Sequence, residues 1–533
     1  MLLYLLPLIL HSFIFGEVSG EEGAQRGSSI ESEMDSYDIS SMFSEVRACM
    51  GPHWYEKAIK LYEDTINSQG SQEEIWHAKF MIGNIYNITG EWENALSQYL
   101  DAYQYYPVRA EPLEKISKYY RENKQNNLAY LFASQGKKIS YPINQEFFVD
   151  DEVYNYRFDE DLSIASYYTP FREEGLKASD RLLFNRKTPP HIKYNTEKNL
   201  RFYVQSLPNL RLKSLPIKPP LIREGAQLRC NPMNPSILKT DDGYTVICRC
   251  VNYTQEKALY YRLIDPNAGD KGVVKARNFL LQYDKNFSLL SQKEIIDEIS
   301  QSMKCPPYTS VQDVEDCRVF EYKNALWATG TVWDMDIYHM PKIGLYKLGD
   351  SSSNSKQVFM EYFIPLEGPV PGLCEKNWLP FIKDEKIHVI YGYDPLTVYS
   401  IEPETGCRTQ VLQHEQTDNF SNFRGSAGPV PFDDGYLVVI HQVVFDDGRH
   451  YFHRFLYLDE DYNIKSVSQP FTYKGSRVEY CCGMTIDHSG STLIMTVGIE
   501  DREAILAFID LASIRSLLSF PEKDVYFQNV NYK

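Results

Sequence analysis

The chain has 533 residues, of which 43% are hydrophobic and 24% are charged. This is the composition of a globular protein of about three domains, and it excludes a disordered or collagen-like chain. The 72 Asp and Glu outnumber the 55 Lys and Arg, which gives a net charge of −17. A chain this acidic repels phosphate backbones, so neither nucleic acid nor a broad anionic membrane surface is expected as a partner.

The first segment has the pattern of an export signal. Residues 2–15 form one apolar run, and small residues follow it at 18–20. The run is too short for a membrane span, which needs about 20 apolar residues. We therefore expect a signal peptide over residues 1–20 rather than an uncleaved anchor. The mature chain would then lie in the secretory pathway, in the endoplasmic reticulum or Golgi lumen or outside the cell, without a membrane span.

Sequons and cysteines fit that compartment. N-glycosylation acceptor patterns occur at Asn87, Asn252, Asn286 and Asn419. The ten cysteines permit disulfides, but they form no CxxC pair and no Cys/His spacing typical of zinc. We expect buried thiols with one or two disulfides, and no metal site.

Residues 21–44 are rich in Gly, Ser, Glu and Asp and are expected to be a flexible linker. Residues 45–139 carry apolar side chains at helical spacing. Within them, Gly83, Ala95, Tyr99, Ala102 and Pro107 stand at positions that resemble those of the tetratricopeptide repeat. About three repeats would make either a short groove for a protein partner or a packing module for the rest of the chain.

Residues 140–222 read as a mixed connector with a helix or two, and 518–533 as a C-terminal tail. From 223 to 517 the pattern changes to short apolar runs separated by Gly, Asp, Asn and Pro, such as those at 244–248, 388–391 and 436–440. Such runs predict strands, and about 300 residues of them fit a β-propeller or a large β-sandwich.

A series of motifs then follows in one order along this region. They are Asn234-Pro, Cys248-Arg249, Glu315-Asp-Cys-Arg318, Lys376-Asn377, Gly428-Pro with the strand ending at His441, Glu479 with Gly483, and Gly498-Ile-Glu-Asp501. The series resembles glycoside hydrolase family 130, which holds β-mannoside phosphorylases and mannosidases, and the related glycosyltransferase family 108. The resemblance implies a five-bladed β-propeller over residues 223–517, behind tetratricopeptide-like helices.

The same resemblance implies roles for individual residues. Asp316 would be the general acid that protonates the leaving oxygen, before phosphate or water attacks the anomeric carbon with inversion. Lys376 and His441 would bind phosphate, helped by Arg249 and Arg318. Sugar binding falls to Arg249, Arg318, Asn377, Glu479 and Asp501. No cofactor is implied beyond inorganic phosphate as a possible co-substrate.

Strand alternation adds an expectation about faces. Asp316 and Arg318 should share one face of a strand, with Glu315 and Cys317 on the other. An acid beside a guanidinium can hold a sugar hydroxyl, although the same pair could also be a structural salt bridge between blades.

Three positions depart from the family pattern. Cys317 replaces a Pro, Ile440 replaces a Tyr, and Asn234 stands where related glycosidases have a general base, which argues against activation of water from that position. A separate DxD pattern, at Asp334 and Asp336, lacks the Rossmann-like strand that a nucleotide-metal site would need, so we expect a surface loop there.

The sequence thus favours an inverting phosphorylase, transferase or glycosidase acting on β-linked mannose-like sugars. Two alternatives stay open, namely a glycan-binding propeller without catalysis whose repeats dock a partner protein, and a scaffold that binds only proteins.

Overall fold

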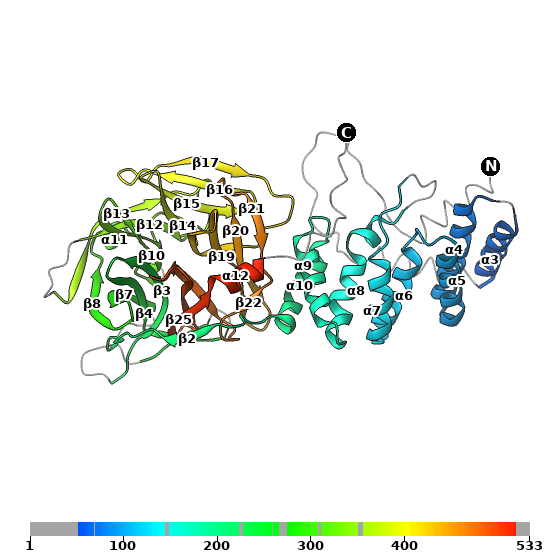
Figure 1. The fold of residues 1–533 in the computed structure, drawn as a ribbon, viewed down its shortest axis with the longest axis horizontal. Coiled ribbons are helices and arrows are strands. Elements are labelled where there is room, and N and C mark those ends of the chain that lie inside the picture. Colours follow the sequence, from blue (N-terminus) through cyan, green and yellow to red (C-terminus); the bar gives the residue numbers. More distant parts are fainter. Residues whose placement is uncertain are drawn as a thin grey trace. The chain divides into compact units, whose positions relative to one another are not determined.

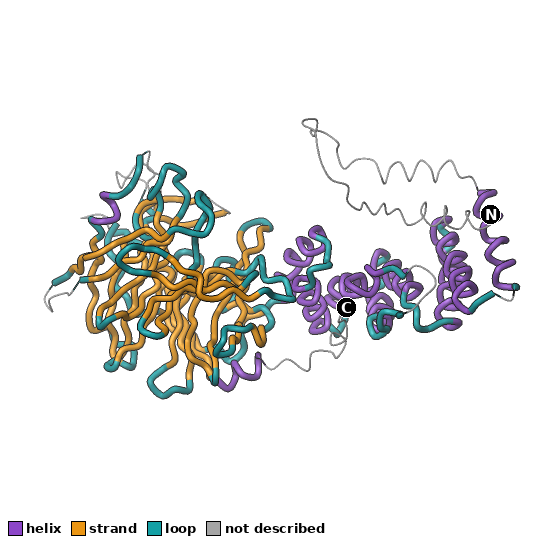
Figure 2. The backbone as a smooth tube through the Cα atoms, turned by 90° about the horizontal axis from the view of Figure 1, so that it is seen from above, coloured by secondary structure: helices purple, strands orange, loops and turns teal. Residues whose placement is uncertain are grey.

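The computed structural model describes residues 52–68, 70–143, 149–222, 227–257, 260–265, 274–306, 311–349 and 355–518. Helices come first along the chain and strands follow, and strands make up most of the regular structure after Tyr203 (Figures 1 and 2). The expected signal peptide and most of the tail lie outside the described residues. Among the described residues, no helix is both long and apolar enough to cross a membrane.

The chain divides into two compact units. The first comprises Met1–Asn123 and Leu131–Tyr154, and the second Lys124–Tyr130 and Asn155–Lys533. The helices that lie before Tyr154 in the described chain are α3 (Pro52–Asn67), α4 (Gln72–Thr89), α5 (Trp92–Tyr105), α6 (Glu111–Glu122) and α7 (Asn126–Gly136).

The pairing of α4 with α5 follows from small residues. A Cβ on Gly83 would lie 2.8 Å from the ring of Tyr99, so only glycine lets the two helices approach this closely. Ala95, Tyr99 and Ala102 are fully buried, and the Tyr99 hydroxyl donates to Asn84 Oδ1 at 2.8 Å. The tetratricopeptide identity of this helix pair stays a prediction.

A buried ion cluster ties α4 to α6. Arg109 is 1% exposed, and its guanidinium donates to Glu73 at 3.0 Å and to Glu111 at 2.6 Å. The same guanidinium lies 4.0 Å from the ring centroid of Trp76. Paired and stacked in this way, the charge is satisfied without water.

In the second unit, helices precede the strands, and the last two of these helices pack on strand residues Val444 and Phe452 through Leu183 and Leu200. The helices are η1 (Val153–Arg157), α8 (Phe158–Ala165), η2 (Ser166–Tyr168), α9 (Arg172–Phe184) and α10 (Pro190–Tyr203). Fully buried Arg454, from a strand, donates to Asp180 Oδ1 of α9 at 2.5 Å. Just beyond the end of α9, Arg186 pairs with Asp394 at 2.6 Å.

Replacing Asp180 by Asn should lower the free energy of unfolding by about 1.5–3 kcal/mol, because a hydrogen bond to a buried guanidinium loses its charge. Urea unfolding of the full chain measures this. A change no larger than that of exposed Asp434→Asn would contradict the role given to the pair in docking α9.

Strands fill the rest of the second unit (Figure 1). They are β1 (Gln205–Ser206), β2 (Arg211–Ser214), β3 (Asn231–Thr240), β4 (Gly243–Val251), β5 (Tyr253–Lys257), β6 (Tyr260–Leu263), β7 (Val274–Asp284), β8 (Leu289–Ile296), β9 (Val311–Gln312), β10 (Glu315–Tyr322), β11 (Ala325–Val332), β12 (Lys342–Leu348), β13 (Gln357–Leu366), β14 (Leu379–Lys383), β15 (Lys386–Tyr393), β16 (Leu396–Ile401), β17 (Arg408–His414), β18 (Arg424–Phe432), β19 (Gly435–Phe445), β20 (Arg449–Leu458), β21 (Ile464–Val467), β22 (Phe471–Thr472), β23 (Glu479–Ile486), β24 (Thr492–Ile499) and β25 (Glu503–Asp510). Short helices α11 (Ile299–Ser302) and α12 (Leu511–Leu518) complete the described elements.

Consecutive strands pair antiparallel in groups. The groups that begin at β3 and β10 hold four main strands each and are joined by the parallel pair β8–β13 into one nine-stranded sheet. The group that begins at β14 is a four-stranded sheet, and the group that begins at β18 belongs to a six-stranded sheet. The last group, β23–β25, gains its fourth strand from β2, which pairs antiparallel with β25. The chain segment before the first group therefore completes the last one.

The core lies between successive groups. Five apolar clusters each combine residues of two groups, and the last group shares its cluster with the first. Adjacent residues enter different clusters, as Val438 and Val439 of β19 do. This explains why the run at 436–440 is continuously apolar, since both faces of the strand are buried.

Candidate functional site

The first strands of the groups, β3, β10, β14, β18 and β23, contact one another in cyclic order. Residues on or just before these strands supply most of the candidate site. Asn234 comes from β3, Asp316 from β10, Asn377 from the segment before β14, Ser426 from β18 and Tyr480 from β23.

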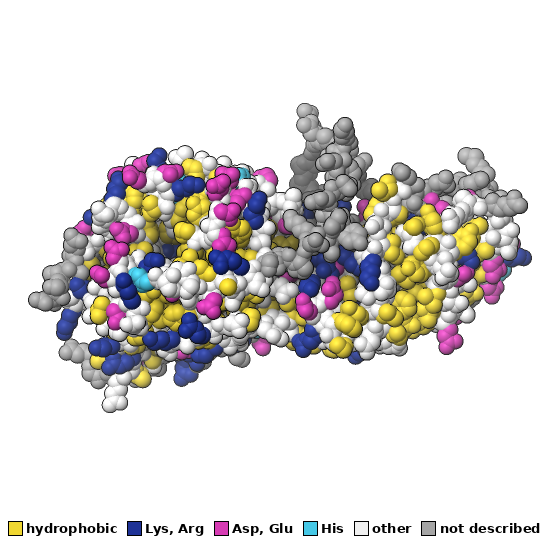
Figure 3. All heavy atoms as spheres, viewed as in Figure 1, with side chains coloured by type: hydrophobic (Ala, Val, Ile, Leu, Met, Phe, Trp, Pro, Cys, Tyr) yellow, Lys and Arg dark blue, Asp and Glu magenta, His cyan; other side chains and the backbone are white. Residues whose placement is uncertain are grey.

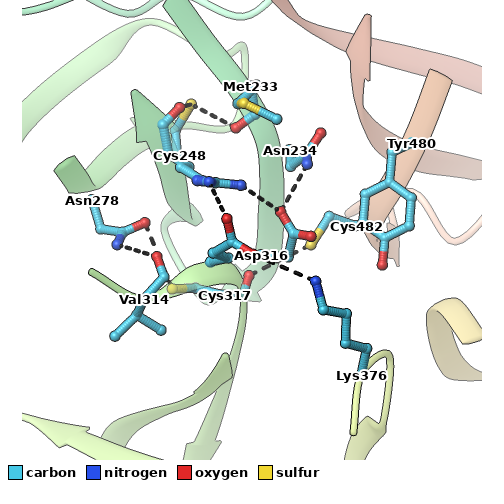
Figure 4. Close-up of polar contacts among 12 residues, drawn as sticks. Met233, Asn234, Cys248, Asn278, Val314, Asp316, Cys317, Lys376, Tyr480 and Cys482 are labelled. Atoms are coloured by element: carbon cyan, nitrogen blue, oxygen red, sulfur yellow. Dashed lines mark hydrogen bonds and ion pairs between the residues drawn. The ribbon is translucent and has the colours of Figure 1, made fainter. Parts of the chain in front are cut away.

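Two neighbouring carboxylates, Glu315 and Asp316, form the centre of the site, and Figure 4 shows Asp316 with Asn234 beside it. Arg249 donates to Glu315 Oε1 at 2.6 Å and to Asp316 Oδ1 at 3.4 Å. Asn234 Nδ2 also donates to Asp316 Oδ1, at 2.7 Å. Oδ1 of Asp316 is thus engaged twice, while Oδ2 has no hydrogen-bond partner within the described residues.

The predicted alternation of faces is wrong at this point. Glu315 and Asp316 both reach Arg249, because the register of β10 against β11 shifts between Glu315 and Arg318. A bulge of this kind places two successive side chains on one side of the strand. Cys317 alone turns away into the apolar core.

Glu315 is fully paired. Its Oε2 accepts from Trp333 Nε1 at 3.2 Å and lies 3.6 Å from Lys376 Nζ. Lys376 Nζ also lies 5.0 Å from the centroid of the Trp333 ring. Burial alone would raise the pKa of Glu315, but Arg249 and Lys376 outweigh it and hold the pKa below its ordinary value.

Arg318 is tied to the segment that carries Lys376. Its guanidinium donates to the Tyr480 hydroxyl at 2.6 Å and to the carbonyl of Asp316 at 3.2 Å. The Tyr480 hydroxyl in turn donates to Asn377 Oδ1 at 2.6 Å. Tyr480 therefore positions Asn377, and through it the neighbouring Lys376.

Replacing Tyr480 by Phe should cost about 1–3 kcal/mol of stability, because half-buried Asn377 loses the donor to its Oδ1 and the buried guanidinium of Arg318 loses an acceptor. If the site binds an anion through Lys376, the apparent Michaelis constant for that anion should rise more than kcat falls. Unfolding curves and steady-state kinetics measure the two effects. Unaltered values of both would exclude a positioning role.

Asp501 follows β24 and joins the same cluster. It is 8% exposed, and burial raises its pKa to about 6. The positive charges of Arg449 and Arg249 oppose this shift, whereas the carboxylates of Asp316 and Glu315 add to it.

His441 lies near the cluster as a neutral ring. It is 2% exposed, its Nδ1 is 2.8 Å from Ser426 Oγ, and Tyr480 packs edge-on against it. Burial, with His453, Arg424 and Arg318 nearby, lowers its pKa well below the ordinary value. A cationic role in phosphate binding, as the sequence suggested, therefore does not fit this environment.

Glu479 lies outside the cluster. Its buried carboxylate accepts from the backbone N–H groups of Tyr473, Lys474 and Ser476, so it anchors the loop before β23. In the motif that the sequence resembles, Tyr-Glu-x-x-Gly, the Glu stands three residues before the Gly, and Tyr480 holds that position before Gly483 here. Counting back from the glycine would have found Tyr480, which sequence reasoning missed.

Four site residues have left-handed backbone angles. The φ values are 42° for Asn234, 52° for Asp316, 66° for Asn377 and 52° for Asp501. Backbone in this region is strained for most side chains, and such residues concentrate at functional sites. Gly498 is needed beside them, since a Cβ there would lie 2.1 Å from Asn234 Oδ1.

The remaining sequence features lie elsewhere. Asp334 is 1% exposed and its carboxylate is 3.0 Å from His339, so the expected surface loop is wrong for this residue. All nine cysteines among the described residues are free thiols, whereas one or two disulfides were expected. No group of three potential metal ligands occurs in the described ranges.

The sequons differ in accessibility. Asn87 and Asn286 are exposed and Asn419 is half-buried. Asn252 is 6% exposed, and its Oδ1 accepts from the backbone N–H of Lys275 at 2.9 Å. Glycosylation at each of the four stays a prediction.

Comparison with known proteins gives fold similarity only. No family model matches the chain, and no curated protein matches it. Among solved structures, it is similar to a β-1,2-mannobiose phosphorylase from Listeria innocua, with 13% identity over 58% of this chain and 99% of that one, at a TM-score of 0.38. It is also similar to MPT-4, a mannose phosphorylase from Leishmania mexicana (10%, 55% and 89%, 0.34), and to an α-L-arabinanase from Cellvibrio cellulosa (9%, 54% and 98%, 0.31). At this distance the functional argument depends on the site itself.

Proposed function

We propose that the β-rich region is a five-bladed propeller whose central site cleaves a glycoside. Two observations support the architecture. The five apolar clusters are shared between successive strand groups in a closed cycle. In addition, β2 comes before the first group in sequence and pairs with β25 of the last group, as expected for a closed propeller.

The observation that carries the proposed activity is the convergence of Asn234 and Arg249 from the first strand group, Asp316 from the second, and Lys376 from the segment before β14. Asn234 and Arg249 fix Oδ1 of Asp316, which leaves Oδ2 as the oxygen that can give a proton to a leaving group. The Asp316 side chain is 23% exposed and that of Lys376 is 31% exposed, so both can meet a ligand.

Inorganic phosphate is the proposed nucleophile. Lys376 carries a positive charge at the accessible side of the cluster, where a phosphate oxygen could be held for attack on the anomeric carbon. In an inverting reaction of this kind phosphate takes the place of a second catalytic group. The motif series adds the expectation of a β-linked mannose-like sugar.

The test is phosphate-dependent cleavage. The purified chain is incubated with a panel of β-linked manno-oligosaccharides, with and without inorganic phosphate, and the products are followed by NMR. Release of an α-sugar 1-phosphate supports the proposal. Absence of turnover across the panel, with glycan binding intact, would leave the non-catalytic alternative in its place.

One observation favours that alternative. Glu315 already pairs with both Arg249 and Lys376, which reduces the positive charge available to a phosphate. A glycan-binding propeller needs no such charge, and polar groups flanked by Trp333 and Tyr480 could hold sugar hydroxyls and ring faces. Sugar-induced stabilisation without turnover would support it.

We further propose that the chain works in the secretory pathway, on the basis of its apolar N-terminal run and its sequons. The helical unit would bind a protein partner. Its exposed apolar side chains support this, and Figure 3 shows apolar side chains gathered over the helices; those exposed in the unit include Leu100, Tyr105, Val108 and Leu131.

A further inference from the structure

The turn that carries Asp501 is held rigidly. The backbone N–H of Glu500 donates to Val478 at 2.7 Å, and that of Arg502 donates to Ile499 at 2.9 Å. Glu500 Oε1 accepts from the N–H groups of Arg477 and Val478 at 2.8 and 3.1 Å. These bonds hold Asp501 at its left-handed φ, so the carboxylate is fixed without a hydrogen bond of its own.

The carboxylate itself is buried and unpaired. Among the described residues, Asp501 makes no side-chain hydrogen bond and no ion pair, although it is more than nine-tenths buried. A buried, unpaired carboxylate is costly unless a ligand completes its surroundings.

The charged groups around Asp501 come from three strands. Arg449 at the start of β20 and Arg249 on β4 favour its ionised form, while Asp316 and Glu315 on β10 oppose it. Burial is the largest influence, and the pKa of about 6 lies close to neutral pH. The site therefore holds Glu315, which stays ionised, and a second carboxyl that exchanges a proton near pH 6.

We infer that Asp501 is a general base for water, which gives the site a hydrolytic activity beside phosphorolysis. The inference rests on the proposed function, in which Asp316 is the acid. Asn234 stands where related glycosidases carry their base, and its amide cannot accept a proton from water. Asp501 can accept this proton, because it is the carboxylate of the cluster that has no pairing partner.

The step balances as follows. Water attacks the anomeric carbon and gives one proton to Asp501, while the bond from that carbon to the leaving oxygen breaks with its electron pair. Asp316 gives its proton to that oxygen. The products are a sugar of inverted configuration and a free alcohol, and the proton on Asp501 then leaves to solvent as Asp316 takes one up.

The experiment compares the two reactions in the full-length chain. In phosphate-free buffer, Asp501→Asn should lower hydrolysis by about 10²–10⁴-fold, the usual contribution of general base catalysis. Phosphorolysis should fall much less, because phosphate brings its own nucleophilic oxygen. The pH profile of wild-type hydrolysis should contain a rising limb near pH 6, where Asp501 ionises, and Asp501→Asn should lose that limb. Exposed Glu503→Gln is the matched control and should retain both reactions.

A second variant distinguishes loss of the base from misfolding. Asp501→Ala with sodium azide should regain turnover and yield an α-glycosyl azide from a β-linked substrate, since azide needs no base. Equal losses in both reactions, or hydrolysis unchanged in Asp501→Asn, would overturn the inference. If wild-type turnover strictly requires phosphate, the inference about Asp501 is wrong but the proposed phosphorolysis stands. If there is no turnover with or without phosphate, both the inference and the proposed function are wrong.

Discussion

Replacing Asp316 by Asn is expected to lower glycoside turnover by about 10²–10⁴-fold, while sugar affinity changes little. The amide keeps the size of the side chain, and its oxygen can still accept from Asn234 and Arg249 as Oδ1 does. It cannot deliver a proton from the position of Oδ2. The measurement is kcat with an unactivated substrate, beside sugar binding by calorimetry.

The leaving group offers an internal check. A substrate with a good leaving group, such as a dinitrophenyl glycoside, needs little protonation, so Asp316→Asn should lose far less activity on it. The matched control is Asp433→Asn, a surface acid paired with Arg515. If the variant lost both substrates to the same extent, Asp316 would act through structure and not as the acid.

The order of elements could be predicted from the sequence because strong periodic signals carry it. Gly83 and Tyr99 marked a helical repeat, and the apolar run at 436–440 marked a strand. The pairing of β2 with β25 could not be predicted, because Arg211–Ser214 is short, exposed and mostly polar. The role of β2 in completing the last strand group is evident only from its pairing with β25.

The expectations about the faces of β10 and the charge of His441 were wrong for local reasons. A bulge at the start of β10 brought Glu315 beside Asp316, and no alternating pattern reports a bulge. Because Glu315 and Asp316 share Arg249, Glu315→Gln should also disturb Asp316. His441 was given a charge from its residue type, whereas its burial is a property of the packed strands.

Replacing Arg249 by Met is expected to lower the free energy of unfolding by about 3–5 kcal/mol and to abolish turnover. Arg249 is 3% exposed and is the donor shared by both carboxylates. Removing one partner of a buried ion pair leaves the other charge uncompensated, which is the costly case. Arg249→Lys keeps the charge, but a single ammonium cannot bridge both acids, so an intermediate loss is expected.

The pH dependence of the stability loss in Arg249→Met identifies the cause of that loss. The folded-state pKa of Glu315 is lowered, so its ion pairs stabilise the fold above the ordinary Glu pKa, and this stabilisation disappears as pH falls through the lowered value. The stability gap between wild type and Arg249→Met should therefore be full at neutral pH and narrow below about pH 4. Exposed Arg515→Met should change stability little at either pH. A gap that stayed constant down to pH 3 would mean that Arg249 stabilises the fold through packing of its side chain and not through the two carboxylates.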